Sequence, residues 1–481
     1  VAVRSGSKMT AKALEAGAGG NLKLVVRVGA GVDTIDLDAA TRLGVIVENT
    51  PGTNARGVVE LTLAGLLAMA RQVIPAHNSL KEGRWDKKKF GGTQLQDKTI
   101  GIVGLGNIGQ GVARLAKGFG MEVLAFDPVV TPERAGECGA KLVELDDLFA
   151  RADFISLHAS LNDATREMVN ADSIAKMKDG VCIANCARAG LVKEDDLLAA
   201  LDSEKVRYYY TDVFDKEPPP EDDPLVKHPS VFMTPHVGGS TAESAVEGAL
   251  QAGRQIAAYL EDKKVINSVN FTPGAPELEP YEGLAETLGR IVWQLNSDAQ
   301  GFKEIRITYS GDIAEYEPAR VSSKFFVGLL TKTHEGVNIV SAPYLAREMG
   351  TKVTVTRSAK GTTRMFVEVV AGKYTSTYAA SMQGVVPVLH SVDGHELDLP
   401  MGEKHYLFTK HSDVPGIVGI IGTELGKAGI NIEKMALRDI PGEPSMAVIS
   451  TREAVTKRVL KEIEASVDYA GGDIKLKTVN L

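Results

Sequence analysis

Short apolar runs alternate with amphipathic stretches over the first half of the chain. The runs predict strands. The stretches between them, in which apolar residues recur every three or four positions, predict helices such as Val58–Arg71 and Ile108–Phe119. This alternation is typical of a doubly wound α/β fold with parallel sheets. The predicted strands are Leu24–Val28, Val45–Glu48, Thr99–Val103, Glu122–Phe126, Phe154–Leu157, Val181–Asn185 and Val231–Thr234.

The pattern changes in the second half, where helices and strands mix without strict alternation. Apolar residues at helical spacing predict a helix over Tyr281–Leu295. The tail, His405–Leu481, has the order strand, helix, strand, strand, helix, strand. That order predicts a ferredoxin-like split βαβ unit.

Glycine-rich and proline-rich segments divide the chain into domains. Glycines between residues 81 and 92 place a hinge near residues 75–95, and prolines from Thr272-Pro273 to Glu279-Pro280 mark a second boundary. We predict a first domain of residues 1–78 together with 261–275, followed by domains at 79–260, 276–403 and 404–481.

Composition restricts what the protein can bind and where it is expected to be located. Hydrophobic residues make up 44% of the 481 positions and the formal net charge is −8, which argues against nucleic-acid binding. No apolar run reaches the about 18 residues of a membrane span.

The three cysteines complete no metal pattern and fit a reducing compartment, so a cytoplasmic protein is expected. Because the chain opens at Val1, a targeting peptide would precede it, and an organelle stays possible.

The most specific motif is Gly104-Leu105-Gly106-Asn107-Ile108-Gly109, which follows an apolar strand and opens a helix. Gly104 allows a tight turn, Gly106 lets a pyrophosphate approach the backbone, and Gly109 lets helix and strand pack closely. Asp127 ends the next strand, where a carboxylate accepts hydrogen bonds from ribose hydroxyls and repels a 2′-phosphate. The motif predicts a Rossmann-like domain that binds NAD rather than NADP. The alternative is a glycine-rich turn in an unrelated α/β protein.

Three polar residues in the following segments suit hydride transfer between NAD and a 2-hydroxy acid. His236 follows a strand and suits an acid/base near neutral pH. Glu217 would stabilise its imidazolium form, and the guanidinium of Arg188 suits a carboxylate. Taken singly, each residue also has a non-catalytic explanation. His236 could be a structural histidine, Glu217 an exposed loop charge, and Arg188 a member of an ordinary ion pair. Their order after a dinucleotide motif favours catalysis.

These residues resemble the D-2-hydroxyacid dehydrogenase family over about residues 1–270. The matching segments are N-C-A-R-A-G, D-V-F-D-K-E-P and P-H-V-G. The resemblance implies that Arg188 binds the substrate carboxylate and carbonyl, that His236 is the acid/base and that Glu217 is its partner. Asp212 would meet the nicotinamide carboxamide. The other residues that it implies are Asn107, Ile108, Ala187 and Gly238 for the cofactor and Val28, Gly29 and Asn54 for the substrate.

Within that family the chain is most similar to the D-3-phosphoglycerate dehydrogenases, on the stretches at residues 24–33 and 85–90. This similarity implies oxidation of 3-phosphoglycerate to 3-phosphohydroxypyruvate in L-serine synthesis, with Arg4 and Arg27 holding the substrate phosphate. The alternative for both is a surface arginine. The segment S-A-P-Y-L-A-R-E at residues 341–348 resembles the α+β intervening domain of the long form.

The tail resembles an ACT domain, on H-S-D-V-P-G at residues 411–416 and G-I-N-I at residues 429–432. In this family such tails bind L-serine as a feedback inhibitor between two subunits. His411, Asp413 and Asn431 are the matching residues, and a homo-oligomer, dimer or tetramer, is expected. A purely dimerising tail is the alternative.

Some features depart from the family. Ala189 replaces a usual glycine, Ser160 replaces a usual proline, and Tyr208-Tyr209-Tyr210 stands where small apolar residues are usual. The rings are expected to crowd the sheet or to alter nicotinamide packing. The opening strand, helix and strand of the first domain are also expected to be missing, so that something precedes Val1.

Two other functions stay open at this point. One is a hydroxypyruvate or glyoxylate reductase or another D-2-hydroxyacid dehydrogenase, against which Arg4, Arg27 and the C-terminal extension argue. The other is an NADH-sensing binding protein like the dehydrogenase-fold corepressors, which keep the same three catalytic residues. The ACT-like tail argues against it.

Overall fold

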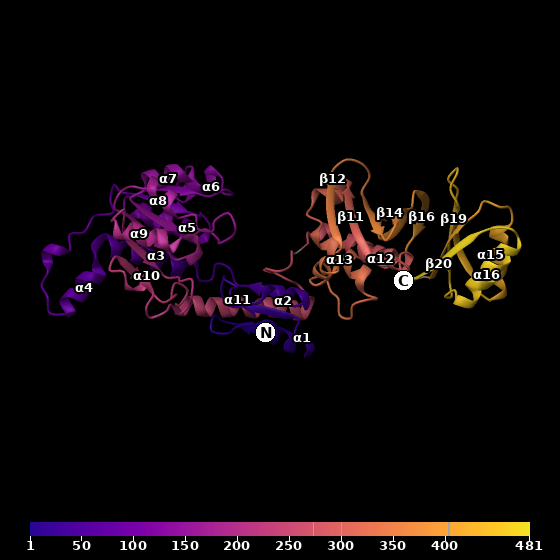
Figure 1. Ribbon diagram of the computed structural model, residues 1–481, viewed down its shortest axis with the longest axis horizontal. Coiled ribbons are helices and arrows are strands. Elements are labelled where there is room, and N and C mark those ends of the chain that lie inside the picture. Colours follow the sequence, from indigo (N-terminus) through magenta and orange to yellow (C-terminus); the bar gives the residue numbers. More distant parts are fainter. Residues whose placement is uncertain (273, 300, 403–404) are drawn as a thin grey trace.

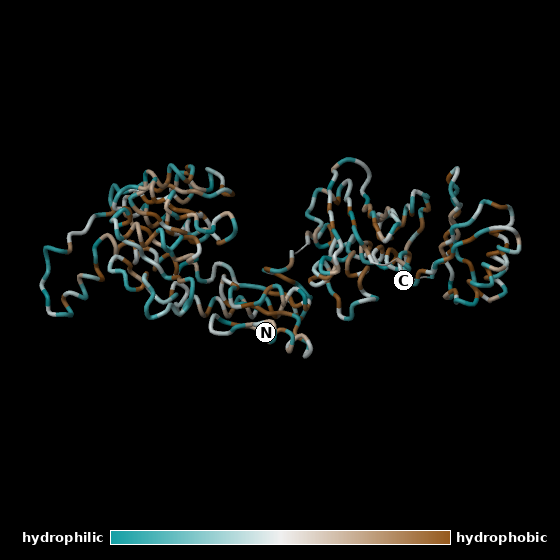
Figure 2. Tube along the Cα trace, in the orientation of Figure 1, coloured by the Kyte–Doolittle hydropathy of each residue, from teal (hydrophilic) through white to brown (hydrophobic). Residues whose placement is uncertain are grey.

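The computed structural model describes residues 1–272, 274–299, 301–402 and 405–481, in which four sheets follow one another along an elongated molecule (Figure 1). The expected boundary between residues 403 and 404 lies outside the described residues, as does Pro273 of the proline-rich stretch, whereas the expected boundary between residues 275 and 276 lies within them. Within each unit the hydrophobic stretches gather in the interior, most clearly around the seven-stranded sheet (Figure 2). The α/β class with a C-terminal ferredoxin-like unit is confirmed.

The N-terminal sheet is parallel and has the order β1-β2-β3. Helices α1 and α2 pack on one of its faces and the long helix α11 packs on the other. Figure 1 shows α11 running from the seven-stranded unit to this sheet. Its elements are β1 Ala2–Val3, α1 Ala11–Gly19, β2 Leu24–Arg27, α2 Leu37–Arg42, β3 Ile46–Asn49 and α11 Ala242–Asp262.

The second sheet is fully parallel, with the order β10-β9-β8-β7-β4-β5-β6. Its strands are β4 Thr99–Val103, β5 Glu122–Phe126, β6 Lys141–Leu142, β7 Phe154–Leu157, β8 Val181–Asn185, β9 Val206–Thr211 and β10 Val231–Met233. The predicted bounds of β4, β5, β7 and β8 are confirmed. Strand β9, which carries the tyrosine run, was not among the predicted strands.

Helices cover both faces of this sheet, as the doubly wound pattern predicts. Helices α3, α5 and α6 pack on one face, and α7, α8 and α9 pack on the other. The helices are α3 Ala55–Arg71, α4 Val73–Lys81, α5 Asn107–Gly118, α6 Pro132–Glu137, α7 Leu145–Arg151, α8 Ala171–Lys176, α9 Glu194–Asp202 and α10 Pro224–Lys227, with 3-10 turns at Lys87–Lys89 and Ala189–Leu191.

The expected hinge at residues 75–95 is partly helical. Helix α3 ends at Arg71, Gln72 adopts a left-handed conformation with φ 50°, and α4 continues to Lys81 at an angle of 67°. Among the described residues no single helix is long and apolar enough to cross a membrane; the bent pair α3 and α4 passes that test by length and composition only.

The third sheet has the order β12-β11-β13-β14-β15-β16, and α12, α13 and α14 pack on its core face. Helix α12 begins two residues before the predicted Tyr281. The elements are a 3-10 turn Pro276–Leu278, α12 Glu279–Leu295, β11 Phe302–Ser310, a 3-10 turn Gly311–Glu315, α13 Ala319–Leu330, α14 Ala342–Glu348, β12 Lys352–Ser358, β13 Arg364–Ala371, β14 Tyr374–Gln383, β15 Val386–Val392 and β16 His395–Pro400.

The C-terminal sheet has the order β18-β19-β17-β20 and the element order that the sequence predicts. Helices α15 and α16 cover one face. The other face, including Tyr406, Phe408 and Val448, shares a core with α12 and the third sheet. The elements are β17 His405–His411, α15 Ile417–Lys427, β18 Ile432–Arg438, β19 Ser445–Thr451, α16 Lys457–Tyr469 and β20 Ile474–Asn480.

The third unit also contacts the N-terminal sheet. The side-chain amide of Asn338 donates to the carbonyl oxygen of Gly44 over 2.9 Å, and Val340 is buried in one cluster with Leu24 and Ile46. A side chain at Gly44 would overlap the Asn338 amide, so the glycine permits this close approach.

Candidate active site

The carboxyl ends of the parallel strands bring the predicted catalytic and cofactor residues to one edge of the seven-stranded sheet. Gly104 follows β4, Asp127 follows β5, Arg188 follows β8, Asp212 follows β9 and His236 follows β10. Open α/β sheets bind their ligands at this edge.

The glycine turn has the geometry that a dinucleotide needs. Gly104 has φ +93°, and a Cβ there would lie 2.7 Å from the backbone nitrogen of Ala159. A Cβ at Gly109 would overlap the carbonyl oxygen of Gly104, whereas one at Gly106 would meet nothing within 4 Å. Helix α5 therefore starts beside open space, and its first N–H groups and positive dipole end suit the pyrophosphate of NAD.

The carboxylate of Asp127 already accepts hydrogen bonds from nearby backbone N–H groups. One carboxylate oxygen accepts from the backbone N–H of Leu105 at 2.8 Å, and the other accepts from Val129 at 2.9 Å and from Val130 at 3.2 Å. A carboxylate offers about four acceptor positions. One position is left for a ribose hydroxyl, so Asp127 also fixes the turn against which NAD would lie.

His236 and Glu217 are in direct contact. The Nδ1 atom of His236 lies 2.7 Å and 2.9 Å from the two carboxylate oxygens of Glu217. The side chains keep 51% and 39% of their exposure, so solvent and ligands reach them. Because Nδ1–H is directed at Glu217, Nε2 is the ring atom left to exchange a proton.

Asp212 holds the loop that carries His236. It is 2% exposed, and its Oδ1 accepts from the Thr234 hydroxyl at 2.6 Å and from the backbone N–H of Val237 at 2.8 Å. Its Oδ2 accepts from Gly238 N–H at 2.8 Å. His236 itself has φ +53°, a conformation that a non-glycine residue adopts at a cost. The buried carboxylate stabilises the loop on both sides of it.

The N-terminal sheet contributes a second group of residues to this edge. Arg188 Nη2 lies 3.2 Å from Asp33 Oδ2, and its Nη1 donates to the carbonyl oxygen of Ala187 at 2.7 Å. A Cβ at Gly239 would lie 3.2 Å from the side-chain amide nitrogen of Asn54. The predicted substrate loop at Asn54 therefore meets the loop that follows His236.

Several charged residues act on Arg27. Burial lowers the pKa of Arg27; Asp33 opposes this shift, while Arg4 and Arg188 add to it. Arg27 donates through Nη1 to the carbonyl oxygen of Val28, and within the described ranges its buried Nε has no hydrogen-bond partner. Beside it, Gly29 N–H donates to the Thr50 hydroxyl at 2.7 Å. The charges of Arg4, Arg188 and Asp33 therefore all act on the guanidinium group of Arg27.

Comparison with known proteins identifies the units. Residues 63–238 match the family model of the D-isomer specific 2-hydroxyacid dehydrogenase NAD-binding domain. Residues 277–387 match the D-3-phosphoglycerate dehydrogenase intervening domain, and residues 405–468 match the ACT domain. The D-3-phosphoglycerate dehydrogenase of Synechocystis sp. is 37% identical over 477 residues, which cover 96% of this chain and 84% of the relative. The chain belongs to the D-3-phosphoglycerate dehydrogenase family.

Another family member, from Methanocaldococcus jannaschii, is also 37% identical, over 474 residues that cover 96% of this chain and 89% of the relative. Among solved structures, the NAD-dependent formate dehydrogenase of Staphylococcus aureus in complex with NAD is 30% identical, with a TM-score of 0.51 over 55% of this chain and 80% of that one. The predicted enzyme class and the predicted cofactor are confirmed: the chain is an NAD-dependent 2-hydroxyacid dehydrogenase.

The ACT domain of this family member separates the predicted effector residues. His411 is 5% exposed at the end of β17, whereas Asp413 and Asn431 lie in exposed loops. Ile432, next to Asn431, is level with His405 through Thr451, and His411 pairs with Ser445 at the other end of the sheet. A single chain therefore does not bring Asn431 to His411 and Asp413.

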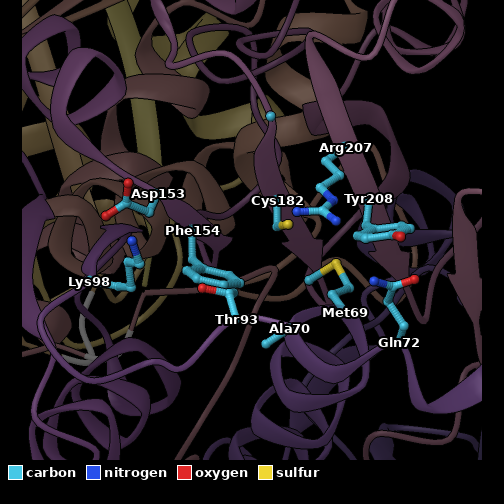
Figure 3. A pocket seen from close by; sticks show the side chains of 11 residues that line it. Met69, Ala70, Gln72, Thr93, Lys98, Asp153, Phe154, Cys182, Arg207 and Tyr208 are labelled. Atoms are coloured by element: carbon cyan, nitrogen blue, oxygen red, sulfur yellow. The ribbon is translucent and has the colours of Figure 1, made fainter. Parts of the chain in front are cut away.

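A cavity of about 170 Å³ lies away from these residues, at the amino ends of the same strands (Figure 3). Tyr208, Phe154 and Cys182 line it together with Met69 from α3. Because the predicted catalytic residues follow the carboxyl ends of the strands, this cavity is separate from the candidate site.

Four residues at the site were not predicted to take part. Asp33 contacts Arg188, Thr234 contacts Asp212, and Asn185 donates from its side-chain amide to the carbonyl oxygen of Arg188 at 2.9 Å. His158 follows β7 at the same edge, and burial lowers its pKa to about 4. A polar residue at the end of an apolar strand, such as Asn185 in V-C-I-A-N, or directly after one, such as His158 and Thr234, is a signal that could have found three of them, whereas Asp33 lies in a turn and carries no such signal.

Proposed function

We propose that this protein oxidises D-3-phosphoglycerate to 3-phosphohydroxypyruvate with NAD and so supplies L-serine synthesis. The observations that carry the proposal are the electrostatic influence of Arg4, Arg188 and Asp33 on Arg27 and the pairing of His236 with Glu217. The cations outnumber the carboxylate, so an anion with both a carboxylate and a phosphate is the matching substrate.

The reaction follows from the positions of these groups. Arg188 binds the substrate carboxylate and polarises the oxygen on C2. His236 takes the proton of the C2 hydroxyl on Nε2, and Glu217 stabilises the imidazolium through Nδ1. Bound NAD supplies the acceptor for the hydride that leaves C2. Asp33 gives up its contact with Arg188 when the substrate carboxylate binds.

Arg27 and Arg4 are proposed to hold the phosphate. The partly buried guanidinium of Arg27 has an unpartnered Nε in the described part of the chain and lies at the end of β2. A buried donor without a partner is costly, and a phosphate oxygen would relieve that cost.

The test is a substrate panel with NAD and NADP. We expect turnover of 3-phosphoglycerate with NAD, and a preference of at least tenfold in kcat/KM over D-glycerate, which lacks the phosphate. Arg27→Gln should remove that preference while activity on D-glycerate persists. Arg42→Gln, on the outer helix α2, is the matched control. Equal activity on both substrates in the unchanged protein would contradict the proposal.

We also propose that L-serine inhibits the enzyme at a site completed by a second copy. Edge strand β18 exposes Ile432, Met435 and Leu437, and in the described residues it pairs only with β19, so its outer edge is suited to pair with a second copy. Antiparallel pairing of two β18 strands would bring Asn431 of one copy toward the His411 and Asp413 end of the other. There, in the described residues, the buried Nε2 of His411 has no partner, and neither has the hydroxyl of Ser445 opposite it.

Asn431→Ala is the test of this effector site. We expect L-serine to inhibit the unchanged enzyme, and the variant to need at least tenfold more L-serine while its turnover without serine is retained. Glu464→Gln, on the exposed face of α16, serves as the control. Absence of any serine response, together with a monomer in light scattering, would contradict both the effector and the dimer or tetramer.

A cytoplasmic location remains part of the proposal. The three thiols, Cys138, Cys182 and Cys186, are buried and unpaired, which suits a reducing compartment. Fractionation of cells that express the full-length protein would test this.

A further inference from the structure

The tyrosine run on β9 places its side chains on alternating faces of the seven-stranded sheet. Tyr210 is buried in the core beneath α3 and α5, and Tyr208 packs against the same core. Tyr209 is buried in the opposite core, with α7 to α9. Because side chains alternate along a strand, neighbouring tyrosines reach different loops at the carboxyl edge.

Tyr209 contacts the loop of Arg188 through one residue. The Asn185 side-chain amide donates to the Tyr209 hydroxyl over 3.2 Å and to the carbonyl oxygen of Arg188 over 2.9 Å. The side-chain oxygen of Asn185 accepts from Ala187 N–H at 3.0 Å. Asn185 is fully buried, so the hydroxyl of Tyr209 fixes the amide that in turn fixes the backbone next to the guanidinium.

Tyr210 contacts the loop of His236 in a similar way. Its hydroxyl lies 2.9 Å from the Thr234 hydroxyl, which donates to Asp212 over 2.6 Å. Since Thr234 has one proton and gives it to the carboxylate, Tyr210 must be the donor in the first bond. Asp212 then accepts from Val237 and Gly238, on the far side of His236.

The structure makes room for these rings. A Cβ at Gly65 of α3 would overlap the ring of Tyr210, so the glycine permits the tyrosine. Burial raises the pKa of Tyr210, and raises that of Tyr209 to about 12, so both hydroxyls stay protonated at neutral pH. The expected crowding of the sheet is therefore relieved by a small residue on the neighbouring helix.

We infer that Tyr209 and Tyr210 are positioning residues for the two halves of the dehydrogenase site. Tyr209 orients the carboxylate-binding Arg188, and Tyr210 orients the loop that carries the acid/base His236. The inference rests on the proposed dehydrogenase reaction. It assigns different kinetic roles to adjacent residues of one strand, which a purely structural function would not produce.

Tyr208 is the matched control. It stacks on Phe232 with ring centroids 5.2 Å apart and lines the cavity at the opposite edge (Figure 3). In the described residues its hydroxyl makes no hydrogen bond. Tyr208→Phe, Tyr209→Phe and Tyr210→Phe each remove one hydroxyl and leave the ring in place.

The experiment measures kcat and KM for 3-phosphoglycerate and for NAD in the three variants of the full chain. Loss of one hydrogen bond corresponds to about a threefold to tenfold change. We expect Tyr209→Phe to raise KM for 3-phosphoglycerate by that factor with KM for NAD unchanged. Tyr210→Phe should lower kcat by a similar factor, and Tyr208→Phe should match the unchanged enzyme. Tyr208→Phe should melt with the unchanged enzyme, whereas Tyr209→Phe, which leaves a buried Asn185 N–H without its acceptor, should melt at a lower temperature.

A second variant tests the chain through Thr234. Thr234→Val should reproduce the kcat loss of Tyr210→Phe, and the double variant should be no worse than Thr234→Val alone, because both changes break one chain. Active unchanged enzyme with three equivalent phenylalanine variants would overturn the inference alone. Absence of NAD-linked turnover in the unchanged enzyme would remove the proposed function, and the inference with it.

Discussion

At the scale of single residues, the site depends on a buried carboxylate as much as on the groups that react. Asp212 receives three donors and fixes the loop on which His236 takes a left-handed conformation. The meeting of His236 with Glu217 could be predicted from short motifs, because acid/base chemistry strongly restricts the types of residue that suit it. The contacts that position these groups could not be predicted. The sequence does not distinguish Thr234, Asn185 and Asp33 from other polar residues, and their partners become apparent only when the strands lie side by side.

Asp212→Asn tests this role. The change places an amide N–H₂ group against one of the backbone N–H donors of the loop, so one hydrogen bond becomes a repulsion. We expect kcat to fall at least tenfold and stability to fall by about 1–3 kcal/mol, measured by turnover and by urea unfolding. Asp215→Asn, in the exposed loop that follows, is the control, and equal behaviour of the two variants would refute this role.

His158 predicts how stability depends on pH. Burial lowers its pKa to about 4 from an ordinary value near 6.5, so the folded state excludes a proton that the unfolded chain binds. This stability is present above pH of about 6.5 and is lost as pH falls toward 4, by at most about 1.4 kcal/mol per pH unit. Urea unfolding at pH 7, 6 and 5 should show this decline, and His158→Asn should flatten it. A variant with an unchanged slope would exclude His158 as the cause.

At the scale of elements, the alternation of apolar runs predicted most of the seven-stranded sheet. Buried parallel strands such as β4, β5, β7 and β8 are continuous apolar runs, and their bounds could be predicted from that pattern alone. Strand β9 was missed although aromatic residues favour strands. Its tyrosines were interpreted as a departure from the family, and whether they fit depends on Gly65, which lies far away in the sequence.

The close packing of Gly65 on α3 against Tyr210 on β9 predicts that substitutions at these two positions have coupled effects on stability. Gly65→Ala adds a Cβ that overlaps the Tyr210 ring, and overpacking of a core costs about 1–3 kcal/mol. Gly253→Ala, on α11, meets nothing within 4 Å and should be neutral or stabilising. Thermal unfolding of both variants measures the difference. In a Tyr210→Leu background the cost of Gly65→Ala should largely disappear; a cost that persists there would place the conflict elsewhere.

At the scale of the whole molecule, the ACT sheet and the intervening domain form one core. Tyr406, Phe408 and Val479 are buried in the cluster that contains α12 and the third sheet. Lys477 also donates from Nζ to the carbonyl oxygen of Leu295 at 2.7 Å, and the backbone N–H of Asn480 donates to the side-chain oxygen of Gln294 at 2.9 Å. The ferredoxin-like pattern alone would leave one face of the ACT sheet open to solvent. In the described residues that face is covered by the intervening domain.

This shared core predicts two cooperative units in calorimetry. The intervening and ACT domains should unfold in one transition, and the nucleotide-binding unit in another. NADH should raise the temperature of the second transition only, because a ligand stabilises the unit that it binds. Phe408→Ala should lower the transition of the C-terminal pair by cavity formation. A separate third transition for the ACT domain would contradict a common core.

The contact between Asn338 and Gly44 has a consequence for control. The ACT sheet cannot move independently when the proposed effector binds at its far end, because it shares a hydrophobic core with the intervening domain. A displacement of the ACT sheet would therefore move the intervening domain with it, and the bond from Asn338 would transmit the movement to Gly44, just before β3 and beside the strand β2 that ends in Arg27. If L-serine inhibits as proposed, its binding would change the orientation of β2, which carries Arg27, relative to the seven-stranded sheet, while each unit keeps its fold.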